Sequence, residues 1–441
     1  MSFERCIGAR SYYTGPHTSP YADGSFRTAP IAPERVANRE PTDAGEPTPR
    51  PMRIAINQLE EYNHLASDGA KQASRALSQM IGVRMRHDVT GVSLVSEEAL
   101  ESVFTGQRYV AVQVGLSGGL SGETVLIFDP SSAGRLRRRL ESRGGGNSLA
   151  GSAFAELGNI MIGGFVDGWA DHVGTQIDMT PPTYLEAAGT RILPRMTRRE
   201  AAETGVFLFE SRLEAVDNDL SVPIYLIPEY DEFVRLLEAQ PSGLSVPAEK
   251  LAVFNGFAAR SAERASGQIA QLTGLRTDVS VSQLRFLSFS DMSAQVGSEP
   301  YVSVVFELTG LPSGYFVAMF SEESAERVAA GMLPKGVDPD GGSMADEAIK
   351  ELGNIVTSGF IDGWANTLQS SIEHTPPELV RDSGSEVIRT VQRRLSGNQR
   401  YAFTIDTTIE LDDREAEVQL YVLPNTRELT EALSALPARA A

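Results

Sequence analysis

Residues 156–171 read ELGNIMIGGFVDGWAD, and residues 351–366 read ELGNIVTSGFIDGWAN. The two stretches share ELGNI, GF and DGWA, and a PP pair follows each of them. Each stretch contributes one of the chain's two tryptophans, Trp169 and Trp364. A repeat of this length predicts two tandem domains that share one signature helix.

The length of the chain agrees with two domains, because 441 residues exceed what one hydrophobic core usually supports. Residues 1–51 are rich in Gly, Pro, Ser and Thr and show no apolar period, so we expect a disordered tail there. Met52 is then a candidate start of translation. The predicted domains are residues 52–242 and 243–441, with a boundary near 241–244.

Each domain shows the same order of elements. In the first, patterning predicts helices at 57–82, 131–143 and 229–239 and strands at 83–95, 109–117, 123–129, 205–216 and 222–228, with a strand-like stretch at 176–188. In the second, it predicts an opening helix at 254–274, an exposed helix at 322–333 and strands at 301–310, 315–321 and 418–424. The fold class is therefore α/β (α+β), with a mostly antiparallel sheet packed against long helices in each domain.

Composition and charge exclude several classes of protein. The net charge of −19 argues against nucleic acid or anionic membranes as partners, because phosphate binding needs a basic surface. The single cysteine, Cys6, excludes a disulfide framework. No apolar run approaches the roughly 20 residues of a membrane span, and the N-terminus lacks a signal peptide, so we expect a cytoplasmic protein without membrane insertion.

The charged residues also suggest a source. Lysine occurs only at positions 71, 250, 335 and 350, whereas Asp and Glu together number 58. An acidic excess with so little lysine is typical of a halophile, whose surface carboxylates stay hydrated in concentrated salt. A genome rich in GC would also favour arginine over lysine.

The signature helix has two different faces. At about 100° per residue, its apolar stripe is predicted to be buried and consists of Leu157, Met161, Phe165 and Trp169, with Ile162 beside them. The opposite face carries Ser152, Glu156, Asn159, Gly163 and Asp167. In the second copy this face is Glu347, Glu351, Asn354, Ser358 and Asp362. Both faces place a carboxylate and a carboxamide three residues apart, so the two side chains project together.

Two interpretations of this polar face compete. On composition alone, a Glu and an Asn on a helix are about three times more often plain solvated residues than a site. Glycines at 158, 163, 164 and 168, however, each cost about 1 kcal/mol in a helix interior, which indicates a compensating benefit. Close packing against strands would explain three of them, while Gly163 would leave room for an approach to the Asn. The polar face is also repeated together with the buried one, and this repetition favours a site.

The spacing resembles that of a known family. Ser or Asp, three residues, Glu, two residues, Asn and then 22 residues to Pro is similar to the active-site signature of the CheC, CheX and FliY phosphatases of chemotaxis. The intervals Asn159 to Pro182 and Asn354 to Pro377 both have this spacing. The resemblance covers residues 52–441 as two CheC-like domains in tandem.

The resemblance implies dephosphorylation of phosphorylated CheY, a response regulator. Asn159 and Asn354 would orient the attacking water, and Glu156 and Glu351 would anchor a lysine of the regulator. The resemblance implies no cofactor for this chain, since Mg²⁺ would belong to the regulator. The supporting positions of the two sites would be Ser152, Gly163, Pro182, Glu347 and Pro377.

This sequence departs from the family pattern at two places. Glu347 stands where the family has Asp or Ser. CheC also carries a copy of the motif on its opening helix, which is degraded here: Glu60 and Asn63 keep the spacing, but alignment places Ser67 where Asn belongs. The second opening helix has Ala252 three residues before Asn255. We therefore expect one site per domain and treat Glu60 and Asn63 as surface residues.

Other functions are less favoured by the sequence. The five histidines, at 17, 64, 87, 172 and 374, include no pair at metal-ligand spacing, so no metal site is predicted. The alternative to an enzyme is a noncatalytic adaptor that uses the same face to bind CheY, the receptor deamidase CheD or a motor switch complex. Fold cannot separate these alternatives.

Overall fold

The structure is a computed structural model that describes residues 53–95, 107–142, 150–192, 206–216, 220–238, 244–333, 343–395, 399–411 and 416–436. The expected tail at 1–51, and most of the expected boundary at 241–244, lie outside these residues. We call the described residues up to 238 the first repeat and those from 244 the second repeat.

The first repeat follows the predicted order of elements. They are β1 (Arg53–Ala55), α1 (Ile56–Ile81), β2 (Met85–Val95), β3 (Arg108–Gly118), β4 (Gly122–Phe128), α3 (Pro130–Ser142), α4 (Ala150–Val173), β5 (Ile177–Met179), β6 (Thr183–Ala188), α5 (Gly189–Ile192), β7 (Val206–Ala215), β8 (Ser221–Pro228) and α6 (Tyr230–Leu236). Helix α1 ends as predicted at Gly82, which has a left-handed φ of 69° and donates its backbone N–H to the carbonyl of Ser78 at 2.9 Å. The signature helix is α4.

The second repeat has the same order of described elements with one more helix, α8. They are β9 (Ser245–Pro247), α7 (Ala248–Thr273), β10 (Thr277–Ser288), α8 (Phe289–Val296), β11 (Pro300–Gly310), β12 (Gly314–Ser321), α9 (Glu322–Met332), α10 (Ser343–Leu368), β13 (Ile372–His374), β14 (Glu378–Ser383), α11 (Gly384–Arg394), β15 (Tyr401–Leu411), β16 (Ala416–Pro424) and α12 (Thr426–Ala435). Helices α8, α11 and α12 are not among the predicted elements. The second signature helix is α10.

The strands form one 14-stranded sheet and a separate two-stranded pair. The order in the large sheet is β13, β11, β12, β16, β15, β10, β2, β7, β8, β4, β3, β5, with β14 also paired to β11 and β6 to β3. Every strand pair in the described residues is antiparallel. The predicted fold class is confirmed, and the sequence did not predict that β2 and β10 join the repeats into one sheet.

The junction between β2 and β10 has a local two-fold register. Leu284 pairs with Leu94, Arg285 with Ser93 and Phe286 with Val92. When the strands of the two repeats are matched in order, Val92, Ser93 and Leu94 are equivalent to Leu284, Arg285 and Phe286. The middle residues of the two strands therefore pair with each other, and the outer residues pair crosswise. Strands β1 and β9 pair in the same manner, with Ile54 opposite its counterpart Val246. We call these two pairings the seam.

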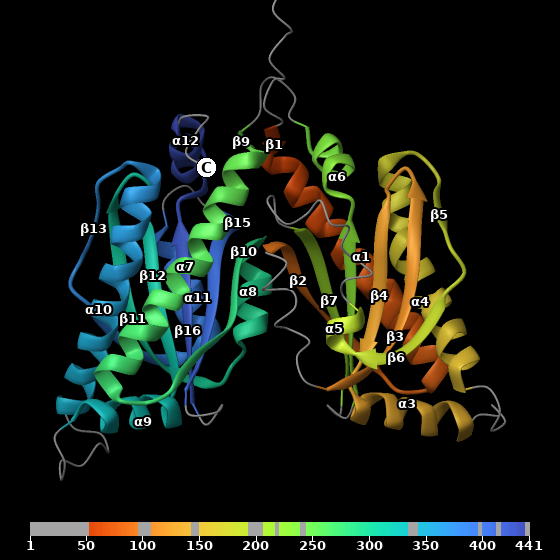
Figure 1. The fold of residues 1–441 in the computed structure, drawn as a ribbon, viewed down its shortest axis with the longest axis horizontal. Helices are drawn as coiled ribbons and strands as arrows, with labels where there is room; N and C mark the ends of the chain where they lie inside the picture. The colour runs from red at the N-terminus through yellow and green to blue at the C-terminus, as the bar shows by residue number, and fades with distance from the viewer. Residues whose placement is uncertain are drawn as a thin grey trace, which may run out of the picture. The chain divides into compact units, whose positions relative to one another are not determined.

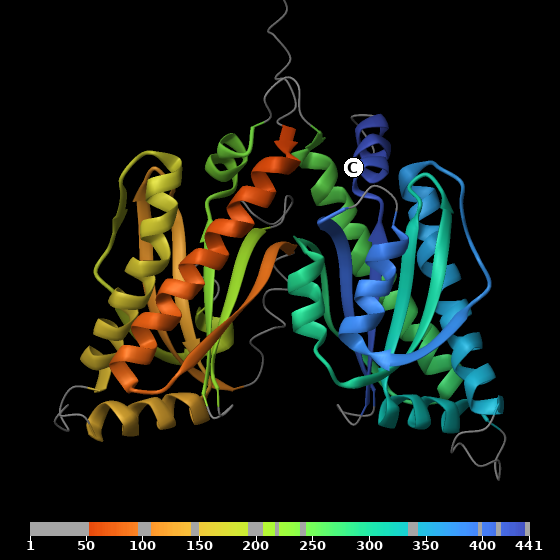
Figure 2. The ribbon, with the colours of Figure 1, turned by 180° about the vertical axis from the view of Figure 1, so that it is seen from behind.

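Two long helices cover one face of the strands in each repeat. Helices α1 and α4 lie side by side in the first repeat, and α7 and α10 in the second (Figures 1 and 2). In the second repeat α8 and α11 cover the opposite face, where Phe289, Met292, Val387, Ile388 and Val391 are buried. None of the helices in the described ranges combines the length and hydropathy of a membrane span.

Candidate functional site

The predicted buried stripe of the signature helix is confirmed. In α4, Leu157, Met161, Phe165 and Trp169 are each 0% exposed. The ring of Trp169 packs edge-on against Phe209 of β7, with 4.7 Å between the ring centroids. Burial of this stripe against the sheet fixes the rotation of the helix and therefore the direction of its other face.

That other face carries the first site, which we define as Ser152, Glu156, Asn159 and Gly163. Ser152, Glu156 and Asn159 are exposed, and Gly163 is half-buried. Residues three apart on a helix have Cβ atoms about 5–6 Å from each other, so the carboxylate and the amide lie together. Within the described part of the chain, the side chains of Glu156 and Asn159 form no hydrogen bond or ion pair. Both remain available to a partner.

The second site consists of Glu347, Glu351, Asn354 and Ser358 on α10. Glu347 and Glu351 are exposed, whereas Asn354 and Ser358 are half-buried. Glu347 is engaged by Lys350 in an ion pair within the same helix. The side chains of Glu351 and Asn354 have no hydrogen bond or ion pair to another described residue. The second site therefore presents the same acid and amide as the first, with more of its surroundings already bonded.

Each site is flanked by the loop that carries the proline pair. Pro182 lies between β5 and β6, Pro377 lies between β13 and β14, and both are half-buried. A threonine anchors each loop to the neighbouring strand: Thr180 accepts a hydrogen bond from the N–H of Gly115 at 2.8 Å, and Thr375 accepts one from the N–H of Glu307 at 3.0 Å. The repeated spacing from Asn to Pro thus places one fixed loop beside each site.

The helical glycines have different surroundings. A Cβ on Gly158 would lie 2.3 Å from Val112 Cγ1, so this position requires glycine for packing on the sheet. A Cβ on Gly164 would make an ordinary 3.7 Å contact with Gln72, and one on Gly168 would meet nothing within 4 Å. The expectation that three glycines permit close packing against strands is therefore correct for Gly158 and wrong for Gly164 and Gly168.

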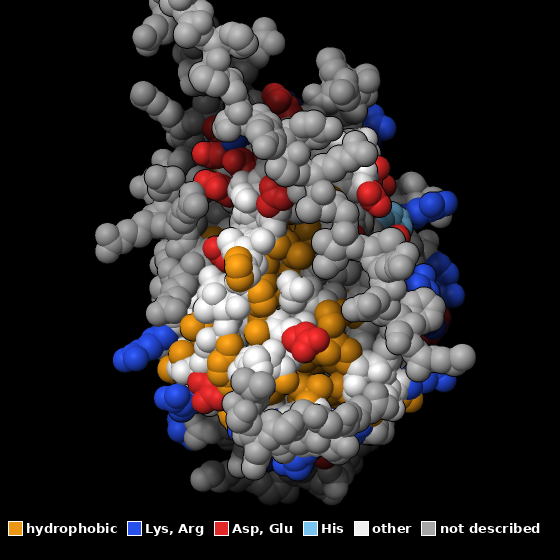
Figure 3. Space-filling model, turned by 90° about the vertical axis from the view of Figure 1, so that its right-hand side faces the viewer, with side chains coloured by type: hydrophobic (Ala, Val, Ile, Leu, Met, Phe, Trp, Pro, Cys, Tyr) orange, Lys and Arg blue, Asp and Glu red, His pale blue; other side chains and the backbone are white. Residues whose placement is uncertain are grey.

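Apolar side chains lie beside the polar ones. Ile160 is 40% exposed next to Asn159, and Met179 of β5 is 37% exposed, with its Cε 3.6 Å from where a Cβ on Gly163 would lie. On α10, Met344 is 53% exposed. Figure 3 shows the side of the first repeat where α4, β5 and α3 lie. In the middle of this view, hydrophobic and uncharged side chains surround a few separate carboxylates. Such a mixture is typical of protein-binding surfaces.

The opening helices carry no equivalent site. Asn63 is only 2% exposed and Asn255 only 5%, so treating Asn63 as a surface residue was wrong. Asn255 Oδ1 accepts a hydrogen bond from the N–H of Leu284, a seam residue, at 3.0 Å. Glu60 is half-buried, and burial raises its pKa despite opposing charges on His64 and Arg400. Packing of α1 and α7 near the seam explains why these positions are closed.

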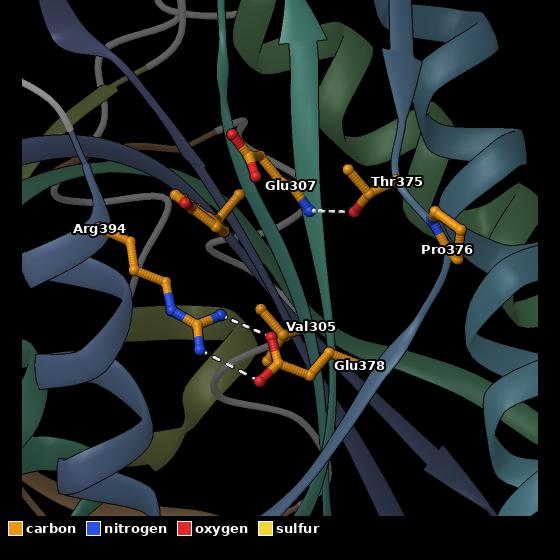
Figure 4. Close-up of a pocket in the computed structure, with 7 residues that line it drawn as sticks. Val305, Glu307, Thr375, Pro376, Glu378 and Arg394 are labelled. Atoms are coloured by element: carbon orange, nitrogen blue, oxygen red, sulfur yellow. Dashed lines mark hydrogen bonds and ion pairs between the residues drawn. The ribbon is translucent and has the colours of Figure 1, made fainter.

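A cavity of about 420 Å³ lies beside the second proline loop. Its lining consists of Val305, Glu307, Tyr315, Thr375, Pro376, Glu378 and Arg394. Arg394 of α11 donates two hydrogen bonds to the carboxylate of Glu378, at 2.6 and 3.1 Å (Figure 4). These bonds hold the pKa of Glu378 below its usual value. The cavity was not predicted, because α11, which supplies the arginine, was not among the predicted elements.

The two histidines near the signature helices have local partners. His172 Nδ1 lies 3.3 Å from a carboxylate oxygen of Glu61, and His374 Nε2 lies 3.1 Å from Ser358 Oγ. Among the described residues no group of three or more His, Cys, Asp or Glu could hold a metal ion. His374 and Met179 were missed as neighbours of the sites. The sequence did indicate them, because each stands the same number of residues after the motif asparagine of its own repeat.

Comparisons with known proteins match this chain to one family. The model of the CheC-like family matches residues 149–186 and 344–381, which contain both sites. CheC1 of Halobacterium salinarum, provisionally named a CheY-P phosphatase, is 30% identical over 194 residues, or 43% of this chain and 98% of CheC1. The CheY-P phosphatase CheC of Bacillus subtilis is 22% identical over 203 residues, or 43% of this chain and 97% of that protein.

A solved structure is similar at lower identity. The crystal structure of Thermotoga maritima FliY is 20% identical and aligns with a TM-score of 0.35, covering 41% of this chain and 93% of that one. The family assignment depends on the paired matches to the family model and on the near-complete coverage of CheC1. The chain belongs to the CheC-like family and carries two CheC-like regions in tandem.

Proposed function

We propose that this protein dephosphorylates the aspartyl phosphate of a CheY-type response regulator and that it has one site in each repeat. The observation that carries the proposal is that a Glu and an Asn, bonded to no other described side chain, lie three residues apart on the solvent-facing side of the signature helix in both repeats. The names of the two CheC relatives support CheY-P as the substrate.

The amide suits the proposed reaction. A carboxamide both donates and accepts hydrogen bonds, so Asn159 or Asn354 can hold a water molecule in line with the phosphorus. An acyl phosphate is reactive enough to need little basic assistance, and positioning supplies most of the acceleration in phosphoryl transfer. The metal ion that neutralises phosphate charge is expected on the regulator, and no cofactor is proposed for this chain.

The acid suits docking. A carboxylate facing the phosphate would be repelled, so Glu156 and Glu351 are proposed to pair with a cationic lysine of the regulator next to the phosphate. Exposed apolar neighbours such as Ile160 and Met179 would add buried area around this ion pair. The Asn and the Glu therefore have separate roles, and kinetics can distinguish them.

The test is the decay of the phosphorylated cognate regulator in molar salt, with and without this protein. We expect acceleration by the wild type and a decline of about 100-fold in kcat for the double variant Asn159→Ala, Asn354→Ala. The double variant Glu156→Gln, Glu351→Gln should mainly raise KM. Asp171→Asn is a matched control, since it removes a charge from α4 and introduces the residue that the second repeat has at position 366.

Two results would contradict the proposal. If the wild type leaves the decay rate unchanged, the protein is not a phosphatase of that regulator. If it binds the phosphorylated regulator without accelerating decay, the same face belongs to a noncatalytic adaptor.

A further inference from the structure

Apart from Ser152 and its equivalent Glu347, the two sites differ in one pair of residues that face each other. One turn after the asparagine, the first site has Gly163 and the second has Ser358. The strand residue that lies over this turn is Met179 in the first repeat and His374 in the second. An apolar contact in one repeat is thus replaced by a hydrogen-bonded pair in the other.

The hydrogen-bond partners define where the hydrogens lie. Ser358 Oγ is 2.8 Å from the carbonyl oxygen of Asn354, which can only accept, so the serine hydroxyl donates there. Ser358 Oγ also lies 3.1 Å from His374 Nε2. Because the serine hydrogen is already used, the Nε2–H of the ring donates to the hydroxyl oxygen. His374 Nδ1 is 3.0 Å from the carbonyl oxygen of Thr375, which also only accepts. All three bonds coexist only when both ring nitrogens carry hydrogen.

The surroundings hold the ring in this position. His374 lies on β13, which pairs with β11, and its ring stands edge-on to Phe306 with 5.3 Å between the ring centroids. Thr375 is fixed by two hydrogen bonds with Glu307, one from its own N–H at 2.9 Å and one to its Oγ1 (Figure 4). The acceptor of Nδ1 therefore cannot move away easily.

A neutral imidazole must break this chain of bonds. If Nε2 loses its hydrogen it becomes an acceptor, and the Ser358 hydroxyl turns to it and away from the Asn354 carbonyl. If Nδ1 loses its hydrogen, its lone pair faces the Thr375 oxygen without a bond. A serine bonded to the carbonyl four residues earlier also bends a helix, so the direction of Asn354 changes with that bond.

We propose that Ser358 and His374 are positioning residues for Asn354 and that they make the second site responsive to protonation while the first is not. This inference rests on the proposed function, since it concerns the asparagine that orients the water. The elements packed around the ring carry the carboxylates of Glu307 on β11, Glu373 on β13, and Glu351 and Asp362 on α10. The first turns of α10 also carry Asp346, Glu347 and Lys350. None of these carboxylates forms an ion pair with His374 in the described residues.

The activity test compares two chains that each retain one site. Asn159→Ala leaves only the second site, and Asn354→Ala leaves only the first, which serves as the control for any pH dependence of the regulator. When the pH is raised from 5.5 to 8, we expect the ratio of second-site to first-site rates to fall about 10-fold, because loss of a ring hydrogen breaks the bonds that hold Asn354. Parallel pH profiles for the two chains would overturn the proposal.

Exchanging the Ser–His pair and the Gly–Met pair between the two sites tests whether this pair causes the pH dependence. In the Asn159→Ala background, Ser358→Gly with His374→Met gives the second site the glycine and methionine of the first, and the ratio should then stay constant with pH. In the Asn354→Ala background, Gly163→Ser with Met179→His should introduce the pH dependence. A ratio that still falls after the first exchange would assign the effect to another group.

A measurement without the regulator separates this inference from the proposed function. In nuclear magnetic resonance spectra, we expect the side-chain amide signals of Asn354 to shift with the same midpoint as the ring signals of His374, and those of Asn159 to stay constant. If neither chain dephosphorylates the regulator but this coupled titration is seen, the proposed function fails and the positioning pair stands. If Asn354 does not follow His374, the pair does not position it.

Discussion

At the scale of single residues, helical periodicity predicted both faces of the signature helix correctly. The stripe ending at Trp169 is buried, and Glu156 and Asn159 are exposed. Periodicity could not assign the glycines, because the contact that each makes depends on which neighbour packs against it. Of the glycines at 158, 163, 164 and 168, only Gly158 lies against a strand residue closely enough to exclude a methyl group.

This difference predicts opposite effects of the same substitution. Gly158→Ala should reduce the free energy of unfolding by about 1–3 kcal/mol, because its Cβ would lie 2.3 Å from Val112 Cγ1. Gly168→Ala should raise it by up to about 1 kcal/mol, since alanine is the better helix former and nothing lies within 4 Å. Urea denaturation of both variants measures the two values. A Gly158→Ala protein as stable as Gly168→Ala would show that the contact with Val112 relaxes without cost.

At the scale of elements, helix ends and short helices were the least predictable. Helix α11 has a serine cap, Ser383, whose hydroxyl accepts from the N–H of Glu386 at 3.4 Å. That Ser-x-x-Glu spacing is a signal in the sequence for a helix start, and it was missed. Helix α8 spans only 8 residues, too few for a clear apolar period. Both helices cover the sheet face away from the sites, so missing them left the Glu and Asn assignments unchanged, but missing α11 also meant missing the cavity that Arg394 lines.

The start of α3 gives a prediction about pH. Asp129 Oδ1 accepts from the N–H of Ser131 at 2.8 Å and of Ser132 at 2.9 Å. Burial acts to raise the pKa of Asp129, but the hydrogen bonds from these serines outweigh it, and the pKa is lowered. A lowered folded-state pKa means that the carboxylate contributes stability above the unfolded-state pKa and that this contribution is lost as pH falls through the folded-state value.

We expect Asp129→Ala to lower the free energy of unfolding by about 1 kcal/mol at pH 7. Asp129→Asn is the matched control, because asparagine caps the helix without titrating. The stability of the wild type relative to Asp129→Asn should decline as pH is lowered from 6 to 3.5, as measured by denaturation at each pH. A constant difference over this range would mean that the cap does not depend on ionisation.

At the scale of the whole molecule, the repeat predicted two similar units but not the sheet that joins them. Strands β2 and β10 have the alternation of any strand with one buried face, and nothing in either local pattern specifies the partner across the repeats. The pairing depends on packing between residues far apart in sequence. At the seam, Arg285 also forms a buried ion pair with Asp406 at 2.7 Å.

The seam predicts cooperative unfolding of both repeats. Trp169 and Trp364 are 0% and 1% exposed, one in each repeat, so Trp364→Phe and Trp169→Phe leave a fluorescent reporter in one repeat at a time. Within each variant, the denaturation midpoint from fluorescence should equal that from circular dichroism, because strand pairing links the repeats. Fluorescence that changes at a lower denaturant concentration than circular dichroism would show that one repeat unfolds independently.

Equivalent residues of the two repeats pair with each other at the seam, and this pairing restricts insertions and deletions in the joining strands. Ile54 lies opposite Val246 and Ser93 opposite Arg285, so an inserted residue in either strand displaces pairs on both sides of the axis. Only a compensating insertion in the other half would restore the alignment. Loops at the outer ends of the sheet are free of this requirement. Insertions and deletions accumulated during evolution should therefore gather far from the axis, while the paired segments of the joining strands keep their register.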